Sequence, residues 1–179
     1  MLSKTFTILL LASCLTAPGQ SPQAFTSIEA YKTLPGVRLI TSLDTSLLSP
    51  HPEIRFGSFT RHRMELHPDG KYKLLRRDCT TLTTLDSGTW NIAFERMVEI
   101  QSRIFGKKLY DVLEYGRFII LVESVERRKF VDLFRDLQAN DTGPFIFNDI
   151  LYTKEDIITM GLGIYHFVIE RRPRSQLTF

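Results

Sequence analysis

The chain has 179 residues, of which 43% are apolar and 24% are charged, the composition of one ordinary globular domain with its own core rather than two. Its 23 basic and 20 acidic residues give a formal net charge of +3. This balance argues against a nucleic-acid-binding protein, which needs a clustered basic face.

Residues 1–20 have the pattern of a secretory signal peptide. A single Lys4 precedes an apolar stretch from Phe6 to Ala12, and small residues follow it. This stretch is too short to span a membrane, and no later segment approaches the roughly 20 apolar residues that a span requires. We therefore expect an exported protein without a transmembrane span, located in the periplasm, outside the cell, or anchored by a lipid to the cell envelope.

Two ways of processing this leader remain open. Small residues after the apolar stretch favour cleavage after Gly19 or Gln20. The sequence LASC, which ends at Cys14, instead matches the pattern at which bacterial lipoproteins are cleaved and acylated. The leader would then end before Cys14, and the acyl chains would anchor the domain. If the leader is removed whole, Cys79 is the one cysteine left and no intramolecular disulfide forms.

The region after the leader predicts a series of short strands. Residues 21–35 are expected to form a short helix or a loose lead-in, and residues 36–43 a first strand. Further strands, separated by turn signals about every ten residues, are expected at 59–66, 71–77, 79–85, 89–93, 97–105, 108–114 and 117–123. Such spacing favours an antiparallel meander that closes as a barrel, because closure removes exposed strand edges.

Four short segments carry the turn residues that separate these strands: His67-Pro68-Asp69-Gly70, Asp86-Ser87-Gly88, Gly106-Lys107 and Tyr115-Gly116. Proline presets the backbone angle φ for a turn, and glycine accepts a positive φ. The last of the four predicts a hairpin between the strands at 108–114 and 117–123.

The pattern changes to helical spacing after residue 123. Residues 124–138 place four apolar side chains on one stripe, with Ser124 as the expected N-cap; these are Phe130, Leu133, Phe134 and Leu137. Short extended pieces follow at 145–148 and 150–152. A second short helix is expected to begin after Thr153, with Asp156 completing a capping box, and to end at Gly161.

A last strand is predicted at 163–172, and residues 173–179 form a loose tail. The expected fold is therefore mainly β, an antiparallel up-and-down barrel or curved meander sheet with a C-terminal helix and a second short helix. We expect residues 36–172 to form a single β domain.

Two short motifs resemble those of bacterial lipocalin-like, calycin-type exported domains. They are Leu66-x-Pro68-Asp69-Gly70-x-Tyr72 and Ser87-Gly88-Thr89-Trp90-x-Ile92, and the resemblance covers about residues 36–123. It implies a small up-and-down β-barrel, sometimes with an interior apolar pocket. Typical lipocalins carry G-x-W on the first strand, with an Arg from a late strand packed on the Trp. Here Gly88-x-Trp90 comes mid-chain, so that role is not transferred to Trp90.

The sequence carries no motif of the common catalytic or metal sites. It has no H-E-x-x-H or C-x-x-C spacing, no G-x-S-x-G nucleophile elbow and no glycine-rich phosphate loop. His62 and His67 lie close in sequence, but strand alternation keeps them from converging. We therefore expect no metal, no cofactor and no catalysis.

Aromatic side chains are the remaining functional signal. We predict that the domain binds a small apolar or amphipathic ligand through Tyr72, Trp90, Phe105, Tyr110 and Phe118. The same rings could instead fill a small barrel completely, which would make the protein a structural or interaction protein of the cell envelope. A hydrolase with an unrecognised site is a third alternative. An interior cavity of about 300 Å³ or more would favour the ligand-binding prediction over the filled core.

Overall fold

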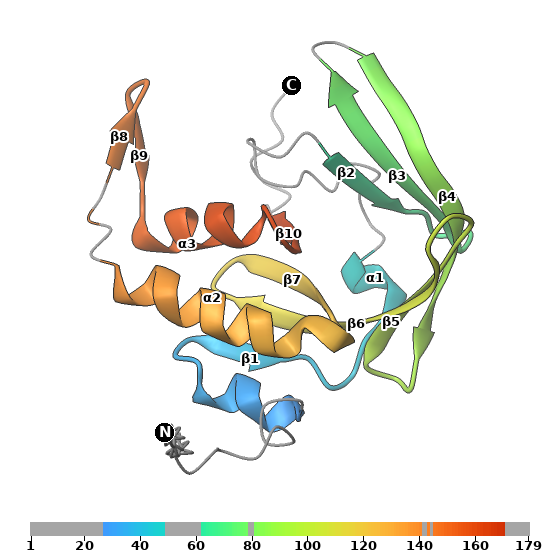
Figure 1. The fold of residues 1–179 in the computed structure, drawn as a ribbon, viewed down its shortest axis with the longest axis horizontal. Helices are drawn as coiled ribbons and strands as arrows, with labels where there is room; N and C mark the ends of the chain where they lie inside the picture. Colours follow the sequence, from blue (N-terminus) through green and yellow to red (C-terminus); the bar gives the residue numbers. More distant parts are fainter. Residues whose placement is uncertain (1–26, 49–61, 79–80, 141–142, 144, 171–179) are drawn as a thin grey trace, which may run out of the picture.

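The computed structural model describes residues 27–48, 62–78, 81–140, 143 and 145–170 (Figure 1). The leader with Cys14, Cys79 at the start of one predicted strand, the first residues of the strand predicted at 59–66, and the tail at 173–179 lie outside this part of the chain. Within the described residues, no helix is both long and apolar enough to cross a membrane.

The described residues form a mainly β fold, as predicted, built on a curved antiparallel sheet. The hydrogen-bonded order is β10-β7-β6-β5-β4-β3-β2, and β1 pairs with β6. The strands are β1 (Val37–Leu39), β2 (His62–Leu66), β3 (Lys71–Asp78), β4 (Thr81–Ala93), β5 (Met97–Ser102), β6 (Gly106–Tyr115), β7 (Phe118–Glu123) and β10 (Phe167–Glu170). The sheet curls into a nearly closed barrel, with β2 and β10 as the last strands of the hydrogen-bonded path (Figure 1).

One predicted turn is wrong, because Asp86, Ser87 and Gly88 lie inside the continuous strand β4. The pairing of β3 with β4 shifts by one residue there: Leu74 faces Asp86 and Leu75 faces Thr84. This shift is a β-bulge, which bends a strand without ending it. Gly88 serves close packing rather than a turn, since a Cβ on it would lie 1.9 Å from the backbone oxygen of Gln101 on β5.

The other turns are confirmed or displaced by a few residues. Gly70 has a φ of +79° in the β2–β3 turn, and Gly116 a φ of +55° in the β6–β7 hairpin. The turn predicted at Gly106-Lys107 lies at residues 103–105 instead. The hydroxyl of Ser102 accepts hydrogen bonds from the backbone N–H groups of Ile104 and Phe105, at 3.1 and 2.7 Å. This side chain therefore stabilises the turn before the glycine is reached.

Helices cover one side of the sheet (Figure 1). They are the short η2 (Ile28–Thr33), η3 (Ser124–Glu126), α2 (Arg127–Ala139) and α3 (Lys154–Leu162). The short α1 (Thr45–Leu48) lies on the opposite face, where Leu48 is buried. Phe130 and Phe134 of the predicted stripe are fully buried. Ser124 is not the N-cap of α2, because the 3-10 turn η3 comes first and Glu126 holds the cap position without a side-chain bond.

The second helix begins as predicted. Thr153 and Asp156 form a reciprocal capping box, and α3 continues to Leu162, one residue beyond the predicted end at Gly161. The two extended pieces before it are confirmed as the hairpin β8 (Phe145–Phe147) and β9 (Ile150–Tyr152). The strand predicted at 163–172 is described as β10, from Phe167 to Glu170.

Two apolar clusters form the core, one on each face of the sheet. The inner cluster includes Met64, Leu66, Tyr72, Trp90, Ile100, Tyr110, Ile119 and Leu121. The outer cluster lies between the sheet and the helices and includes Tyr31, Leu34, Leu113, Phe118, Ile120, Phe130, Phe134, Ile158 and Leu162. Strand β7 contributes to both, because successive side chains point to opposite faces. Its uninterrupted apolar sequence, FIILV, follows from burial on both sides.

Candidate functional site

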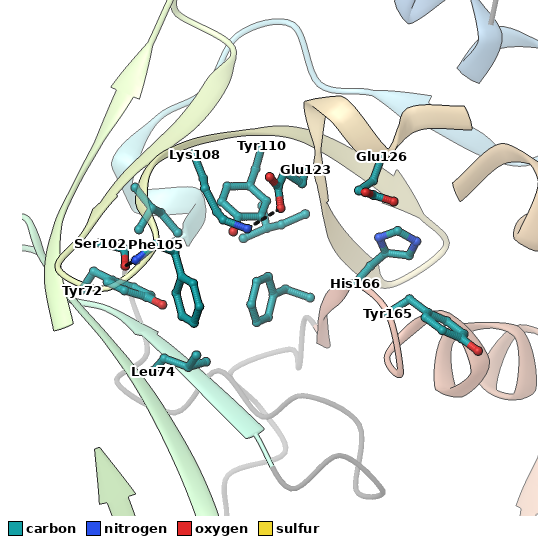
Figure 2. Close-up of a pocket in the computed structure, with 13 residues that line it drawn as sticks. Tyr72, Leu74, Ser102, Phe105, Lys108, Tyr110, Glu123, Glu126, Tyr165 and His166 are labelled. Carbon is teal, nitrogen blue, oxygen red and sulfur yellow. Dashed lines mark hydrogen bonds and ion pairs between the residues drawn. The ribbon is translucent and has the colours of Figure 1, made fainter. Parts of the chain in front are cut away.

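A pocket of about 240 Å³ opens beside the inner cluster. Its walls come from β3, β5, β6, β7 and β10 and from the segments that flank them. The lining residues are Tyr72, Leu74, Ile100, Ser102, Phe105, Lys108, Tyr110, Leu121, Glu123, Glu126, Tyr165, His166 and Phe167. Figure 2 shows Tyr72 and Phe105 on one side, Tyr165 and His166 on the opposite side, and Lys108, Tyr110 and Glu123 between them.

The floor of the pocket is buried and its rim is exposed. Ile100 and Leu121 are almost inaccessible, whereas the Phe105 side chain is 59% exposed and Tyr165 is 70% exposed. Strand alternation explains the floor, because Ile100 with Ser102 and Lys108 with Tyr110 are i, i+2 pairs that share a face. The rim residues lie on the β5–β6 turn and on the segment before β10. A ligand could therefore enter past two aromatic rings.

A buried carboxylate lies behind the floor. Asp86 is 4% exposed, and it accepts a 2.5 Å hydrogen bond from the hydroxyl of Ser102 and a 2.8 Å bond from the Ser87 N–H. Burial raises the pKa of the Tyr72 hydroxyl well above its ordinary value, and the charge of Asp86 and a hydrogen bond to it add to the effect. Tyr72 is thus a neutral donor at neutral pH.

Tyr110 is held in the same state. Burial is the main cause of its raised pKa, and the negative charges of Glu123 and Asp86 reinforce it. Its ring also packs edge-on against Phe167, with ring centroids 5.9 Å apart. The pocket therefore presents a fixed, protonated hydroxyl beside apolar ring surface.

An ion pair spans one wall of the pocket. The Lys108 ammonium lies 2.8 Å from the Glu123 carboxylate, and the two side chains are 33% and 26% exposed (Figure 2). The same ammonium lies 5.7 Å from the centroid of the Phe105 ring, within the range of a cation–π contact.

His166 is a pocket residue that the sequence analysis missed. It is 8% exposed and packs edge-on against Phe130 of α2, with ring centroids 5.0 Å apart. Its Nε2 atom is buried and has no hydrogen-bond partner within the described residues. Burial lowers the pKa of its imidazole to about 4, against an opposing pull from Glu126. The ring is therefore neutral at neutral pH. No local pattern marks it, because α2 and α3 create its surroundings.

Three of the five predicted binding residues line the pocket, namely Tyr72, Phe105 and Tyr110. Trp90 lies in the inner cluster outside the lining, where its indole N–H donates a 2.8 Å hydrogen bond to the carbonyl of His67. Phe118 belongs to the outer cluster, on the other face of the sheet, and the guanidinium of Arg117 lies 5.0 Å from its ring centroid.

A metal site has no support in the part of the chain that the structure describes. No group of three or more His, Cys, Asp or Glu side chains is arranged there to hold an ion.

Comparisons of the chain with protein-family models, curated proteins and solved structures found no match. The nearly closed antiparallel barrel is compatible with a lipocalin-like fold, and the likeness extends no further than this architecture.

Proposed function

We propose that this chain is an exported, lipocalin-like domain that binds a small amphipathic molecule in the pocket and performs no catalysis. The observation that carries the proposal is the lining of the pocket: apolar and aromatic walls with a few polar groups that converge on one space, which is the usual make-up of a ligand site. Export rests on the leader pattern of residues 1–20.

The volume of the pocket restricts the size of this ligand. About 240 Å³ falls below the roughly 300 Å³ at which typical ligand pockets begin, so the volume by itself does not favour ligand binding over a filled core. It corresponds to the volume of about eight liquid water molecules. A single ring or a short chain with one polar group would fit, whereas a long fatty acid would not. The filled inner cluster beside the pocket supports the same restriction.

The protonation states of the pocket support binding rather than acid–base chemistry. An efficient general acid or base has a pKa near the working pH. Burial raises the pKa of the hydroxyls of Tyr72 and Tyr110, and it lowers the pKa of the His166 imidazole to about 4. All three groups thus keep one state at neutral pH and can act as fixed hydrogen-bonding partners.

The test is to purify the exported protein gently and to look for bound small molecules by native mass spectrometry and solvent extraction. Phe105→Ala should weaken retention of the ligand several-fold, since this ring forms part of the rim. Phe94→Ala is the matched control, because Phe94 is 75% exposed and is not among the lining residues. A clean apo mass, together with no uptake from a mixture of small amphipathic molecules, would reject the proposal.

One observation favours the interaction protein as a second candidate. The β8–β9 hairpin projects from the body of the fold (Figure 1), and Ile146, Ile150 and Leu151 are 75%, 55% and 62% exposed. A two-stranded hairpin is marginal alone, and its unpaired edges can pair with another chain. Asp149 in its turn makes an anionic membrane an unfavourable partner. The partner we favour is a second copy of this chain, because the edge strands of two such hairpins can pair antiparallel about a two-fold axis.

Light scattering at high protein concentration tests this second candidate. A dimer that Ile146→Lys abolishes and Leu82→Lys leaves intact would support it. Leu82 is the matched control, an apolar strand residue that is 43% exposed on β4. A monomer at every concentration would reject self-association through the hairpin.

A further inference from the structure

Lys108 places a cation inside the aromatic and acidic wall of the pocket. Its ammonium lies between the Glu123 carboxylate, at 2.8 Å, and the Phe105 ring, at 5.7 Å from the centroid. A carboxylate and a ring face are the two partners that stabilise an organic ammonium group in proteins. The chain's own lysine thus occupies a position with the chemistry of a cation site.

The charges around this position favour a cation over an anion. One basic residue, Lys108, and two acidic residues, Glu123 and Glu126, line the pocket. Glu126 also pairs with Lys129 at 2.7 Å. Asp86 adds a buried negative charge behind Ser102, with which no basic side chain of the described residues forms an ion pair. An anionic ligand would meet these carboxylates in a partly desolvated space, where repulsion is strong.

The rings around the pocket act in the same direction. Five aromatic side chains line it: Tyr72, Phe105, Tyr110, Tyr165 and Phe167. The face of an aromatic ring carries a partial negative charge, so several rings around one space attract an ammonium group and accept its apolar substituents. A neutral ligand would gain only the apolar part of this interaction.

The position of the Lys108 ammonium depends on a flexible side chain rather than on the backbone. The charge sits at the end of a flexible four-carbon stem, and the Lys108 side chain is one-third exposed. A ligand ammonium could replace it beside Glu123 while the lysine turns toward solvent. The lysine would then act as an internal competitor that lowers the affinity for the ligand.

We propose that the pocket binds a small organic cation, an amine or quaternary ammonium with one apolar group, whose charged nitrogen takes the place of the Lys108 ammonium beside Glu123 and Phe105. This inference rests on the proposed function, since it names the chemical class of ligand for the same pocket.

The experiment compares three probes of similar size and different charge, namely benzylammonium, benzyl alcohol and benzoate, by calorimetry or by NMR titration of the exported protein. The expected order of affinity is cation, then neutral probe, then anion. Lys108→Met should raise the affinity for the cation by about tenfold, because it removes the competitor from the ring and the carboxylate. Glu123→Gln should lower it by a similar factor.

Lys107→Met is the matched control. Lys107 is the neighbouring residue and pairs with Glu99 at 2.5 Å, outside the pocket lining. The affinity for the cation should not change in this variant. Phe105→Leu is a second, independent variant: it keeps an apolar side chain and removes the ring face, and it should reduce the preference for the cation over benzyl alcohol. The thermal unfolding of each variant checks that the fold is intact.

The outcomes separate this inference from the proposed function. Equal binding of cation and alcohol, with no effect of Lys108→Met, overturns the cation preference and leaves the pocket as a ligand site. Preferred binding of benzoate also overturns it and assigns Lys108 to an anion. If no probe binds to any variant at millimolar concentration, both the cation preference and the ligand site are rejected.

Discussion

The hydroxyl of Tyr31 donates a 2.9 Å hydrogen bond to the carboxylate of Asp111, eighty residues further along the chain. Asp111 is 1% exposed and also accepts hydrogen bonds from the guanidinium of Arg127, one of them at 3.0 Å. Burial, reinforced by Asp111, raises the pKa of Tyr31 far above its ordinary value, so Tyr31 remains a donor. This group of three joins η2, β6 and α2, and part of the segment before residue 36 therefore belongs to the core.

The Arg127–Asp111 pair gives the first prediction. Arg127→Met should lower the free energy of unfolding by about 3–5 kcal/mol, because it leaves a buried carboxylate without its cation. The double variant Arg127→Met/Asp111→Leu should be clearly more stable than Arg127→Met alone, since it removes the uncompensated charge as well. Urea unfolding followed by circular dichroism measures both. Arg128→Met is the control; Arg128 is 64% exposed, and we expect a change below about 1 kcal/mol.

Gly88 gives the second prediction. Gly88→Ala should destabilise the protein by about 3 kcal/mol, because the new Cβ would lie 1.9 Å from the Gln101 carbonyl oxygen and β4 and β5 would have to separate. Gly143→Ala should change the stability little, because a Cβ added to Gly143 would meet no atom within 4 Å among the described residues. Thermal unfolding compares the two variants, and equal melting temperatures would contradict the close approach.

The turns of the sheet show what the sequence could and could not predict about the fold. The β2–β3 and β6–β7 hairpins were predictable, because Gly70 and Gly116 take the positive φ that such turns require. The uninterrupted course of β4 was not predictable. Asp86-Ser87-Gly88 has the composition of a turn, but pairing with β3 and β5 keeps these residues in an extended strand. Whether these three residues form a turn or a strand depends on their pairing with β3 and β5, which the local sequence does not reveal.

The same reasoning applies to the pocket. Tyr72 and Tyr110 could be named as candidate pocket residues because they are aromatic residues on predicted strands, and both line the pocket. Phe118 could not be placed, since β7 is buried on both sides and its sequence does not reveal which face a residue takes. Glu126 and His166 join the pocket through η3 and the segment before β10, so their place depends on how the helices pack on the sheet.

Trp90 gives the third prediction. Trp90→Phe should destabilise the protein by about 1–2 kcal/mol, since it removes the bond to the His67 carbonyl and part of a buried ring. The cost stays modest because this carbonyl keeps a 3.0 Å bond from the Gly70 N–H. The unfolding must be followed by circular dichroism rather than by tryptophan fluorescence, because Trp90 is the single tryptophan of the chain and the variant lacks it. Tyr165→Phe, at an exposed position, is the control; an equal loss there would argue against a role of the indole bond.

His166 gives the fourth prediction, which concerns pH. The imidazole has a pKa of about 4 in the folded protein and about 6.5 in an unfolded chain. As the pH falls below 6.5, the imidazole of His166 binds a proton in the unfolded state but not in the folded state. The folded state therefore loses stability between about pH 6.5 and 4. The contribution of His166 to this loss is about 3 kcal/mol.

Carboxylates that titrate in the same range act equally in wild type and His166→Phe, so the difference between the two isolates His166. We expect the free energy of unfolding, measured with urea, to fall less for the variant than for wild type between pH 7 and 4. If the two free energies fall in parallel, the imidazole of His166 has an ordinary pKa in the folded protein, and the prediction is wrong.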